Sequence, residues 1–186
     1  MTVLRHLPNA ICLLRILLTV PVVLALQSES YAVALALFAV AAISDGLDGY
    51  LAKRFNWTSE LGRFLDPLAD KLLLVAVFLT CAWQGLVPLW LAAAAIARDV
   101  LIGAGALVFK LWFGVINGRP TLISKVNTAL QIIVLIAALV QAMWWVVWPE
   151  IFAALTLLTL ATTVISGGDY VARFLRRAWN PPAERR

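Results

Sequence analysis

The chain has 186 residues, of which 63% are hydrophobic and only 13% are charged, whereas a soluble domain carries roughly 25% charged residues. This composition excludes an ordinary water-soluble domain and predicts an integral membrane protein. A helix needs about 20 apolar residues to cross a bilayer, so the length allows about six crossings and leaves no room for a separate soluble domain.

Apolar runs along the chain predict an all-α fold with six transmembrane helices. In chain order these helices are expected at Pro8–Leu26, Tyr31–Ala52, Leu65–Trp83, Pro88–Phe109, Leu122–Trp148 and Ile151–Tyr170. We expect one domain over residues 1–179, followed by a polar tail over residues 180–186.

The basic residues predict which side of the membrane each connection faces. The connections after the first, third and fifth expected helices contain no Lys or Arg. Cytoplasmic loops are enriched in basic residues, so an even number of spans with both termini cytoplasmic is expected. The net charge of +5 is then a basic cytoplasmic face, which suits anionic lipid head groups. No nucleic-acid-binding motif is present.

Acidic side chains interrupt the second and third apolar runs, where a charge is costly and therefore indicates function. Asp45 and Asp48 are three residues apart, and Asp66 and Asp70 are four apart. Either spacing is one helical turn, so each pair shares a helix face. Two helices are thus predicted to present four carboxylates to one site on the cytoplasmic side.

Four carboxylates near hydrocarbon repel one another unless they are protonated, paired with bases or bridged by metal ions. Two divalent cations balance the four charges, and hard oxygen ligands suit Mg²⁺ or Mn²⁺. Such a site predicts phosphoryl-type chemistry on a lipid. The alternative is a structural network in which the carboxylates pair with nearby bases, namely Lys53, Arg54, Arg63 and Lys71.

Gly49 and Gly62 support the functional interpretation. Each lies in or beside a predicted helix, where glycine costs about 1 kcal/mol relative to alanine. A close approach to the backbone, by a diphosphate or by another helix, explains why glycine stands there.

The acidic frame resembles the signature of the CDP-alcohol phosphatidyltransferases. Asp45-x-x-Asp48-Gly49-x-x-Ala52-Lys53, eight residues, then Gly62-x-x-x-Asp66-x-x-x-Asp70 match it at every acidic and glycine position. Lys53 stands where the family usually has Arg, and Arg54 follows directly. Either of these two basic residues is therefore a candidate to contact the diphosphate. Pro8-Asn9-x-x-Cys12-x-x-Arg15 is similar to the family's N-terminal pattern.

The resemblance implies transfer of a phosphatidyl group from CDP-diacylglycerol to an alcohol, with release of CMP. It also implies that Asp45, Asp48, Asp66 and Asp70 hold the metal ions, Mg²⁺ or Mn²⁺ and two in number, and that Asp70 is the general base. The nucleotide lipid is then bound by residues of the same frame together with the N-terminal one: Asn9, Asp48, Gly49, Ala52, Lys53 and Gly62. Family members are commonly homodimers, so a homodimer is expected.

Two further segments look more like the eukaryotic-type cardiolipin synthases than like the phosphatidylglycerophosphate synthases. They are Ala97–Val100 and Pro120–Thr128. The expected acceptor is therefore phosphatidylglycerol, giving cardiolipin. The alternative acceptor is glycerol-3-phosphate, and an alternative of another class is a small cation or proton-coupled transporter, in which intramembrane carboxylates are also typical.

Basic residues later in the chain have two possible roles each, one in binding and one in the structure. Arg119 and Lys125 are candidate ligands for the acceptor's phosphate, although basic residues at a cytoplasmic helix end are expected in any case. Arg98 and Asp99 lie mid-span, and neighbours in a helix do not share a face. They are expected either to serve as structural partners for other helices or, for Arg98, to meet an anionic lipid.

No removable targeting segment is expected at the N-terminus. The predicted location is the bacterial inner membrane, with the active site on the cytoplasmic side.

Overall fold

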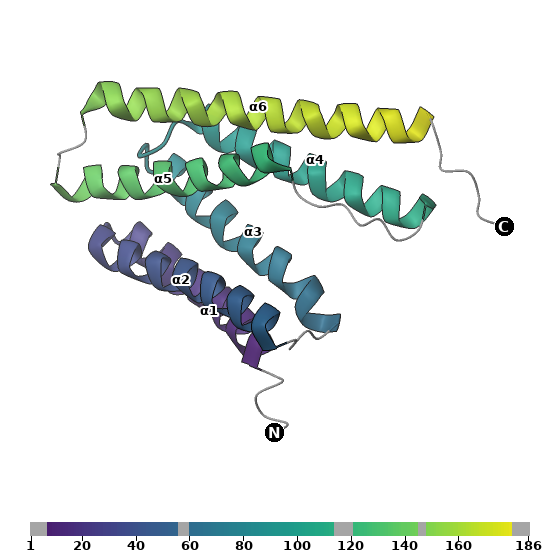
Figure 1. The fold of residues 1–186 in the computed structure, drawn as a ribbon. Coiled ribbons are helices and arrows are strands. Elements are labelled where there is room, and N and C mark those ends of the chain that lie inside the picture. Colours follow the sequence, from purple (N-terminus) through teal and green to yellow (C-terminus); the bar gives the residue numbers. More distant parts are fainter. Residues whose placement is uncertain (1–6, 56–59, 114–120, 145–147, 180–186) are drawn as a thin grey trace. The chain divides into compact units, whose positions relative to one another are not determined.

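A computed structural model describes residues 7–55, 60–113, 121–144 and 148–179, with side chains described over 13–44, 71–108, 121–144 and 148–176. Helices account for nearly all of this part of the chain, and no strand occurs in it (Figure 1). They are α1 (Leu7–Gln27), α2 (Tyr31–Phe55), α3 (Glu60–Trp83), α4 (Leu89–Phe113), α5 (Leu122–Trp144) and α6 (Pro149–Trp179). The prediction of six helices is confirmed.

Two helices extend well beyond their predicted apolar runs. α3 begins at Glu60, five residues before the expected start, and α6 continues to Trp179, nine residues past Tyr170. Polar residues occupy both extensions, including Glu60 and Arg63 in α3 and Arg173 and Arg176 in α6. Hydropathy measures which part of a helix can lie in lipid, whereas the backbone hydrogen bonds continue into water.

The helices form two compact units. Unit 1 comprises Met1–Leu89 and Leu135–Val147, and unit 2 comprises Trp90–Val134 and Trp148–Arg186. The start of α5 therefore belongs to unit 2 and its end to unit 1. The prediction of one domain over residues 1–179 stays a prediction.

In unit 1, α1 packs against both α2 and α3 (Figure 1). Large apolar side chains of all three helices are fully buried, among them Leu26 of α1, Phe38 of α2 and Phe78 of α3. α1 therefore ties together the two helices that carry the four aspartates.

Two helix ends in unit 1 close with the same motif. After α1, Ser30 N donates to Ala25 O and Glu29 N donates to Leu26 O, both at 2.9 Å. After α3, Leu86 N donates to Cys81 O at 2.9 Å and Gly85 N donates to Ala82 O at 3.1 Å. This paired pattern satisfies the last helical carbonyls and requires one residue in the left-handed region.

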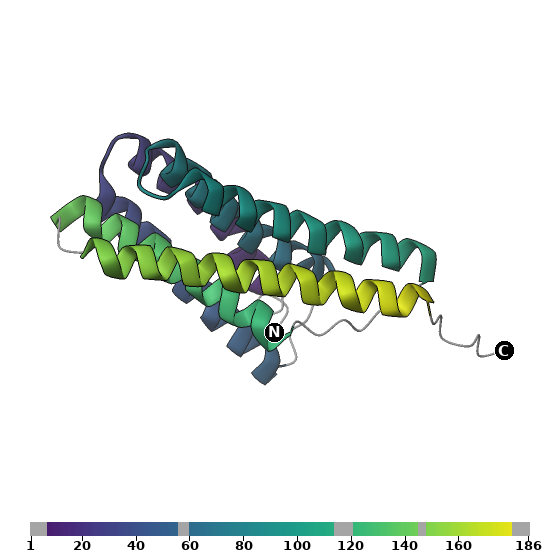
Figure 2. The ribbon, with the colours of Figure 1, turned by 90° about the horizontal axis from the view of Figure 1, so that it is seen from above.

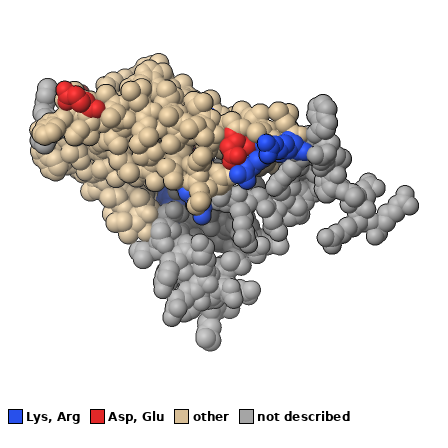
Figure 3. Space-filling model, turned by 45° about the horizontal axis from the view of Figure 1, so that its top comes forward, with Lys and Arg blue, Asp and Glu red and all other residues tan. Residues whose placement is uncertain are grey.

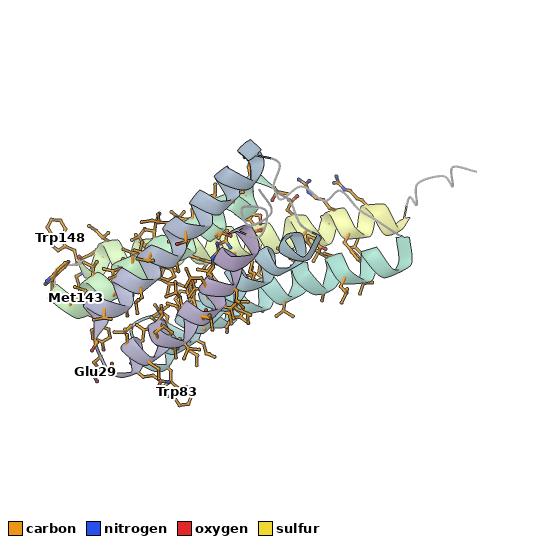
Figure 4. The ribbon with its side chains drawn as sticks, turned by 90° about the horizontal axis from the view of Figure 1, so that it is seen from below. Glu29, Trp83, Met143 and Trp148 are labelled. Carbon is orange, nitrogen blue, oxygen red and sulfur yellow. The ribbon has the colours of Figure 1, made fainter. Side chains whose placement is uncertain are left out.

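Glu29 and Gly85 are those left-handed residues, with φ of 58° and 74°. Gln84 Nε2 also donates to Leu26 O at 2.6 Å, which joins the end of α3 to the end of α1. Glu29 and Trp83, labelled in Figure 4, mark this end of unit 1. It is the end remote from the 56–59 connection between α2 and α3.

In unit 2, α4 runs alongside α6 (Figures 1 and 2). Gly105 of α4 lies against Tyr170 of α6: a Cβ at residue 105 would be 2.7 Å from Tyr170 Cε1. Only glycine leaves room for the tyrosine ring in this position.

Three helices within the described residues are long and apolar enough to cross a membrane, over Leu89–Val108, Leu122–Trp144 and Pro149–Arg176. The described side chains of α1, α2 and α3 add shorter apolar stretches, which are Leu13–Gln27, Tyr31–Ser44 and Lys71–Trp83. The chain therefore has the helices of a membrane protein. Six spans and cytoplasmic termini stay predictions.

Candidate functional site

The four predicted metal-binding aspartates lie on α2 and α3 of unit 1. Asp45 and Asp48 are in the C-terminal half of α2, and Asp66 and Asp70 are in the N-terminal half of α3. The helical backbone confirms that each pair is separated by about one turn. The side chains of these residues lie outside the described ones, so convergence on metal ions stays a prediction.

The aspartates lie at matching distances from the connection between α2 and α3. Asp48 is seven residues before Phe55 and Asp66 is six residues after Glu60, while Asp45 and Asp70 are each ten residues from these helix ends. At 1.5 Å per residue, the inner pair lies about 10 Å and the outer pair about 15 Å along its helix. Residues 56–59 are too few to separate the two helix ends by more than about 18 Å. The chain thus keeps both pairs near one end of unit 1.

The other members of the frame lie on the same helices. Gly49, Ala52 and Lys53 are in α2, Gly62 is in the first turn of α3, and Asn9 is in the first turn of α1. α1 packs against α2 and α3, so all of them belong to unit 1. Their side chains, too, lie outside those described.

Lys125 is the described candidate for the acceptor's phosphate, whereas Arg119 lies outside the described residues. Lys125 is exposed in the first turn of α5. Thr121 caps this helix: Ser124 N donates to Thr121 Oγ1 at 3.1 Å, and Lys125 N donates to Thr121 O at 3.1 Å. The free backbone N–H groups and the dipole of a helix start favour an anion there.

Arg98 is buried at a point where three helices of unit 2 meet. Its Nη2 donates to Ser124 Oγ of α5 at 2.5 Å and to Ser166 Oγ of α6 at 2.7 Å. Its Nη1 donates to Asp99 Oδ1 at 2.5 Å. Arg98 is thus a structural partner for α5 and α6, which confirms the first of the two roles expected for it.

Arg98 also pairs with Asp99, its neighbour on the same helix. Their Cβ atoms leave the helix in different directions, but the arginine side chain is long enough for its guanidinium to return to the adjacent carboxylate. Charge pairing also explains how a guanidinium is tolerated in an apolar helix.

A second polar contact between α5 and α6 was not predicted from the sequence. Asn127 is fully buried, and its Oδ1 accepts hydrogen bonds from Thr162 Oγ1 at 2.9 Å and Thr163 Oγ1 at 2.8 Å. The signal was available: Ser124, Asn127 and Gln131 recur at helical spacing in an otherwise apolar run. On α6 the matching series is Thr156, Thr159, Thr163 and Ser166.

Charged side chains also gather at the C-terminal end of α6 (Figure 3). There Arg173 Nε donates to Asp169 Oδ1 at 3.0 Å, and Arg176 is exposed nearby. Among the described side chains, no three acidic, cysteine or histidine residues are grouped as metal ligands. The metal centre predicted on α2 and α3 stays a prediction.

Acidic pairs on two helices of an apolar, all-helical chain are the feature from which the sequence predicted a membrane enzyme that acts on phosphate-containing lipids. A family model described as CDP-alcohol phosphatidyltransferase matches residues 5–165. The chain belongs to this family.

Individual relatives carry two different activities in their names. A cardiolipin synthase (CMP-forming) of Rattus norvegicus is 35% identical, over 71% of this chain and 49% of its own. A CDP-diacylglycerol–glycerol-3-phosphate 3-phosphatidyltransferase of Pseudomonas fluorescens is 35% identical, over 94% of this chain and 90% of its own. One of the same name from Bacillus subtilis is 33% identical over 74% and 70%. The chain thus spans about half the length of the rat cardiolipin synthase.

Proposed function

We propose that the protein transfers a phosphatidyl group from CDP-diacylglycerol to phosphatidylglycerol, giving cardiolipin and CMP. The observation that carries the reaction class is the acidic frame, placed in matching positions on α2 and α3 within a family match that covers most of the chain. The relatives named above are, by name, a synthase and two phosphatidyltransferases, which favours this reaction over cation transport.

The donor set suits two hard divalent cations, Mg²⁺ or Mn²⁺, held by Asp45, Asp48, Asp66 and Asp70. When bound, such ions neutralise the diphosphate and stabilise the charge that develops on it. Around the donor lipid, Asn9, Gly49, Ala52, Lys53 and Gly62 bind the nucleotide and diphosphate.

Asp70 removes the proton from the acceptor's hydroxyl, whose oxygen attacks the phosphorus that carries diacylglycerol. A bond forms from that oxygen to phosphorus, and the bond from phosphorus to the CMP oxygen breaks. CMP leaves with the electron pair, and Asp70 later returns its proton to solvent. The acceptor oxygen displaces CMP directly, so these steps need no covalent intermediate with the enzyme.

Two segments favour phosphatidylglycerol as acceptor, namely Ala97–Val100 and Pro120–Thr128, which resemble eukaryotic-type cardiolipin synthases. Arg98 of the first segment donates to Ser124 of the second, so they form one hydrogen-bonded structure in unit 2. Lys125, beside Ser124, and Arg119 are the residues that we propose as ligands of the acceptor's phosphate.

Glycerol-3-phosphate is the second candidate acceptor. It is favoured by the Pseudomonas relative, which this chain matches over 90% of that protein's length. A homodimer in the bacterial inner membrane, with the site facing the cytoplasm and anionic lipids around its basic surface, completes the proposal.

The test is CMP release by the purified protein with CDP-diacylglycerol and Mg²⁺, each acceptor being supplied alone. We expect CMP and cardiolipin with phosphatidylglycerol. If products form only with glycerol-3-phosphate, namely CMP and phosphatidylglycerophosphate, then glycerol-3-phosphate is the acceptor and the assignment of phosphatidylglycerol is wrong. No CMP with either, together with cation flux in liposomes, would favour the transporter.

A further inference from the structure

The hydrogen-bonded contact between α5 and α6 is here named the α5–α6 seam and consists of Ser124, Asn127, Thr162, Thr163 and Ser166. Asn127 Oδ1 accepts from both threonines, whose hydroxyls also lie within hydrogen-bond distance of Thr159 O in their own helix, and Arg98 bridges the two serines. Ser124 is paired with Ser166 through Arg98, and Asn127 is paired with Thr163. The paired residues therefore advance by three along α5 and go back by three along α6. This is the register of antiparallel helices.

The seam places amide side chains in an otherwise apolar contact. Asn127 and Gln131, one turn further along α5, are both buried. Burying an amide is costly unless its hydrogen bonds are made, and Asn127 makes two of them with Thr162 and Thr163. This requirement ties one face of α5 to one face of α6.

The seam determines how α5 is rotated about its own axis. Ser124, Asn127 and Gln131 fall within an arc of about 60°, at about 100° per residue. Apolar side chains slide past one another at little cost, and lipid supplies no hydrophobic force between helices. Directional hydrogen bonds from α6 to Asn127 therefore hold one rotation of α5 against the others.

Lys125 is the side chain whose direction depends on that rotation. It follows Ser124 directly, about 100° around the helix from it, and it is exposed while its neighbours in the seam are buried or half-buried. A turn of α5 by one residue would point its ammonium group elsewhere and bring Ser124 out of reach of Arg98.

We propose that the α5–α6 seam is a positioning device for the phosphate of the acceptor: Asn127, held by Thr162 and Thr163, fixes the rotation of α5 and so the direction of Lys125. The inference rests on the proposed function, since it takes Lys125 as the acceptor's ligand. Asn127 is a positioning residue and does not contact the substrate.

A double variant tests the seam with little change in side-chain volume. Thr162→Val with Thr163→Val removes both hydroxyls that bond Asn127. Its matched control is Thr156→Val with Thr159→Val. Within the described residues, the hydrogen bonds of these buried hydroxyls go to carbonyls of their own helix, Ala153 O at 2.8 Å and Leu155 O at 2.7 Å. Thr162→Ser with Thr163→Ser keeps the hydroxyls and serves as the rescue.

We expect the seam variant to raise the KM for the acceptor about fivefold, as two lost interhelical hydrogen bonds would, with the KM for CDP-diacylglycerol unchanged within about twofold. The control and the serine variant should keep both constants. Equal increases in both KM values, or the same increase in the control, would show a merely structural seam and overturn the proposal.

A measurement without turnover separates failure of the seam from failure of the proposed function. Nitroxide labels at Lys125→Cys and Ile151→Cys, in a chain whose two native cysteines are changed to serine, report the rotation of α5 against α6. Thr162→Val with Thr163→Val should broaden the distance distribution, and the control should not. An unchanged distribution rejects the positioning role even if the enzyme is active. A broadened distribution without CMP release in the wild type rejects the proposed function, while the hold of the seam on the rotation of α5 stands.

Discussion

Asp70 is the last acidic residue of the frame and lies ten residues into α3. As the proposed base, it is needed for proton transfer rather than for holding the nucleotide. We expect Asp70→Asn to lower CMP release at least about 100-fold, the usual contribution of general base catalysis. Binding of CDP-diacylglycerol, measured on the same preparation by equilibrium dialysis, should be largely kept.

Asp169→Asn is the control for this prediction. Asp169 forms an ion pair with Arg173 at the end of α6, and an exposed pair of this kind contributes little to stability. This variant should retain turnover. Full activity in Asp70→Asn would refute the assignment of Asp70 as base.

Gly105 and Gly103 make a matched pair of glycines in α4. A Cβ at Gly105 would meet the Tyr170 ring at 2.7 Å, whereas a Cβ at Gly103 would meet nothing within 4 Å. Gly105→Ala should lower the unfolding free energy by about 1 to 3 kcal/mol through overpacking. Gly103→Ala should be neutral or stabilising by up to about 1 kcal/mol, because alanine favours helix.

Thermal unfolding in one detergent measures both glycine variants. Tyr170→Ala removes the ring that a Cβ at residue 105 would meet. Gly105→Ala should therefore lower the unfolding free energy much less when it is introduced into Tyr170→Ala than when it is introduced into the wild type. If the two glycine variants unfold at the same temperature, the contact between residues 105 and 170 does not determine how α4 packs on α6.

At the scale of elements, the ends of α1 and α3 use one motif with different residues in its left-handed position. Glu29 has φ of 58° and Gly85 has φ of 74°. A side chain in this region costs about 1 kcal/mol. Glu29→Gly should therefore stabilise the protein, and Gly85→Ala should destabilise it by about the same amount.

Chemical denaturation in mixed micelles, with the two variants side by side, checks this pair. Gln27→Ala, an exposed change within α1, controls for disturbance of the helix end. A loss of stability in Glu29→Gly would mean that the glutamate side chain contributes more than its backbone conformation costs.

Both apolar contacts and polar bridges join the described helices. α1, α2 and α3 bury large apolar side chains such as Leu26, Phe38 and Phe78. In unit 2, Arg98 bridges α4 to α5 and α6. Polar bridges between helices in lipid determine register as well as association.

At the scale of the whole molecule, the frame carries four negative charges in an apolar chain whose net charge is +5. We expect activity to require divalent cations, because four carboxylates at one site repel one another without them. EDTA should abolish CMP release, and excess Mg²⁺ or Mn²⁺ should restore it.

Added Na⁺ at matched ionic strength is the control, since it screens charge but does not bridge carboxylates. Full turnover in EDTA, or restoration by Na⁺ alone, would contradict a metal centre. It would instead support the structural network in which Lys53, Arg54, Arg63 and Lys71 balance the aspartates.

Much of the fold was predictable because each helix leaves a local signal. The apolar runs identified all six helices, and spacing of three and four residues placed each aspartate pair one turn apart. The helix ends were less predictable: α6 continues nine residues past Tyr170, because an amphipathic end keeps its hydrogen bonds after hydropathy has fallen.

By itself, the sequence determined the all-helical class, the family and the residues of the acidic frame, since these depend on composition and on spacing within one or two neighbouring helices. Only the tertiary structure decided that Arg98 bonds both Asp99 and two serines from other helices, and that Asn127 meets Thr162 and Thr163. Apart from Asp99, those partners are 26 to 68 residues apart in the chain. No local periodicity states which faces of distant helices meet, because that is settled by packing among them.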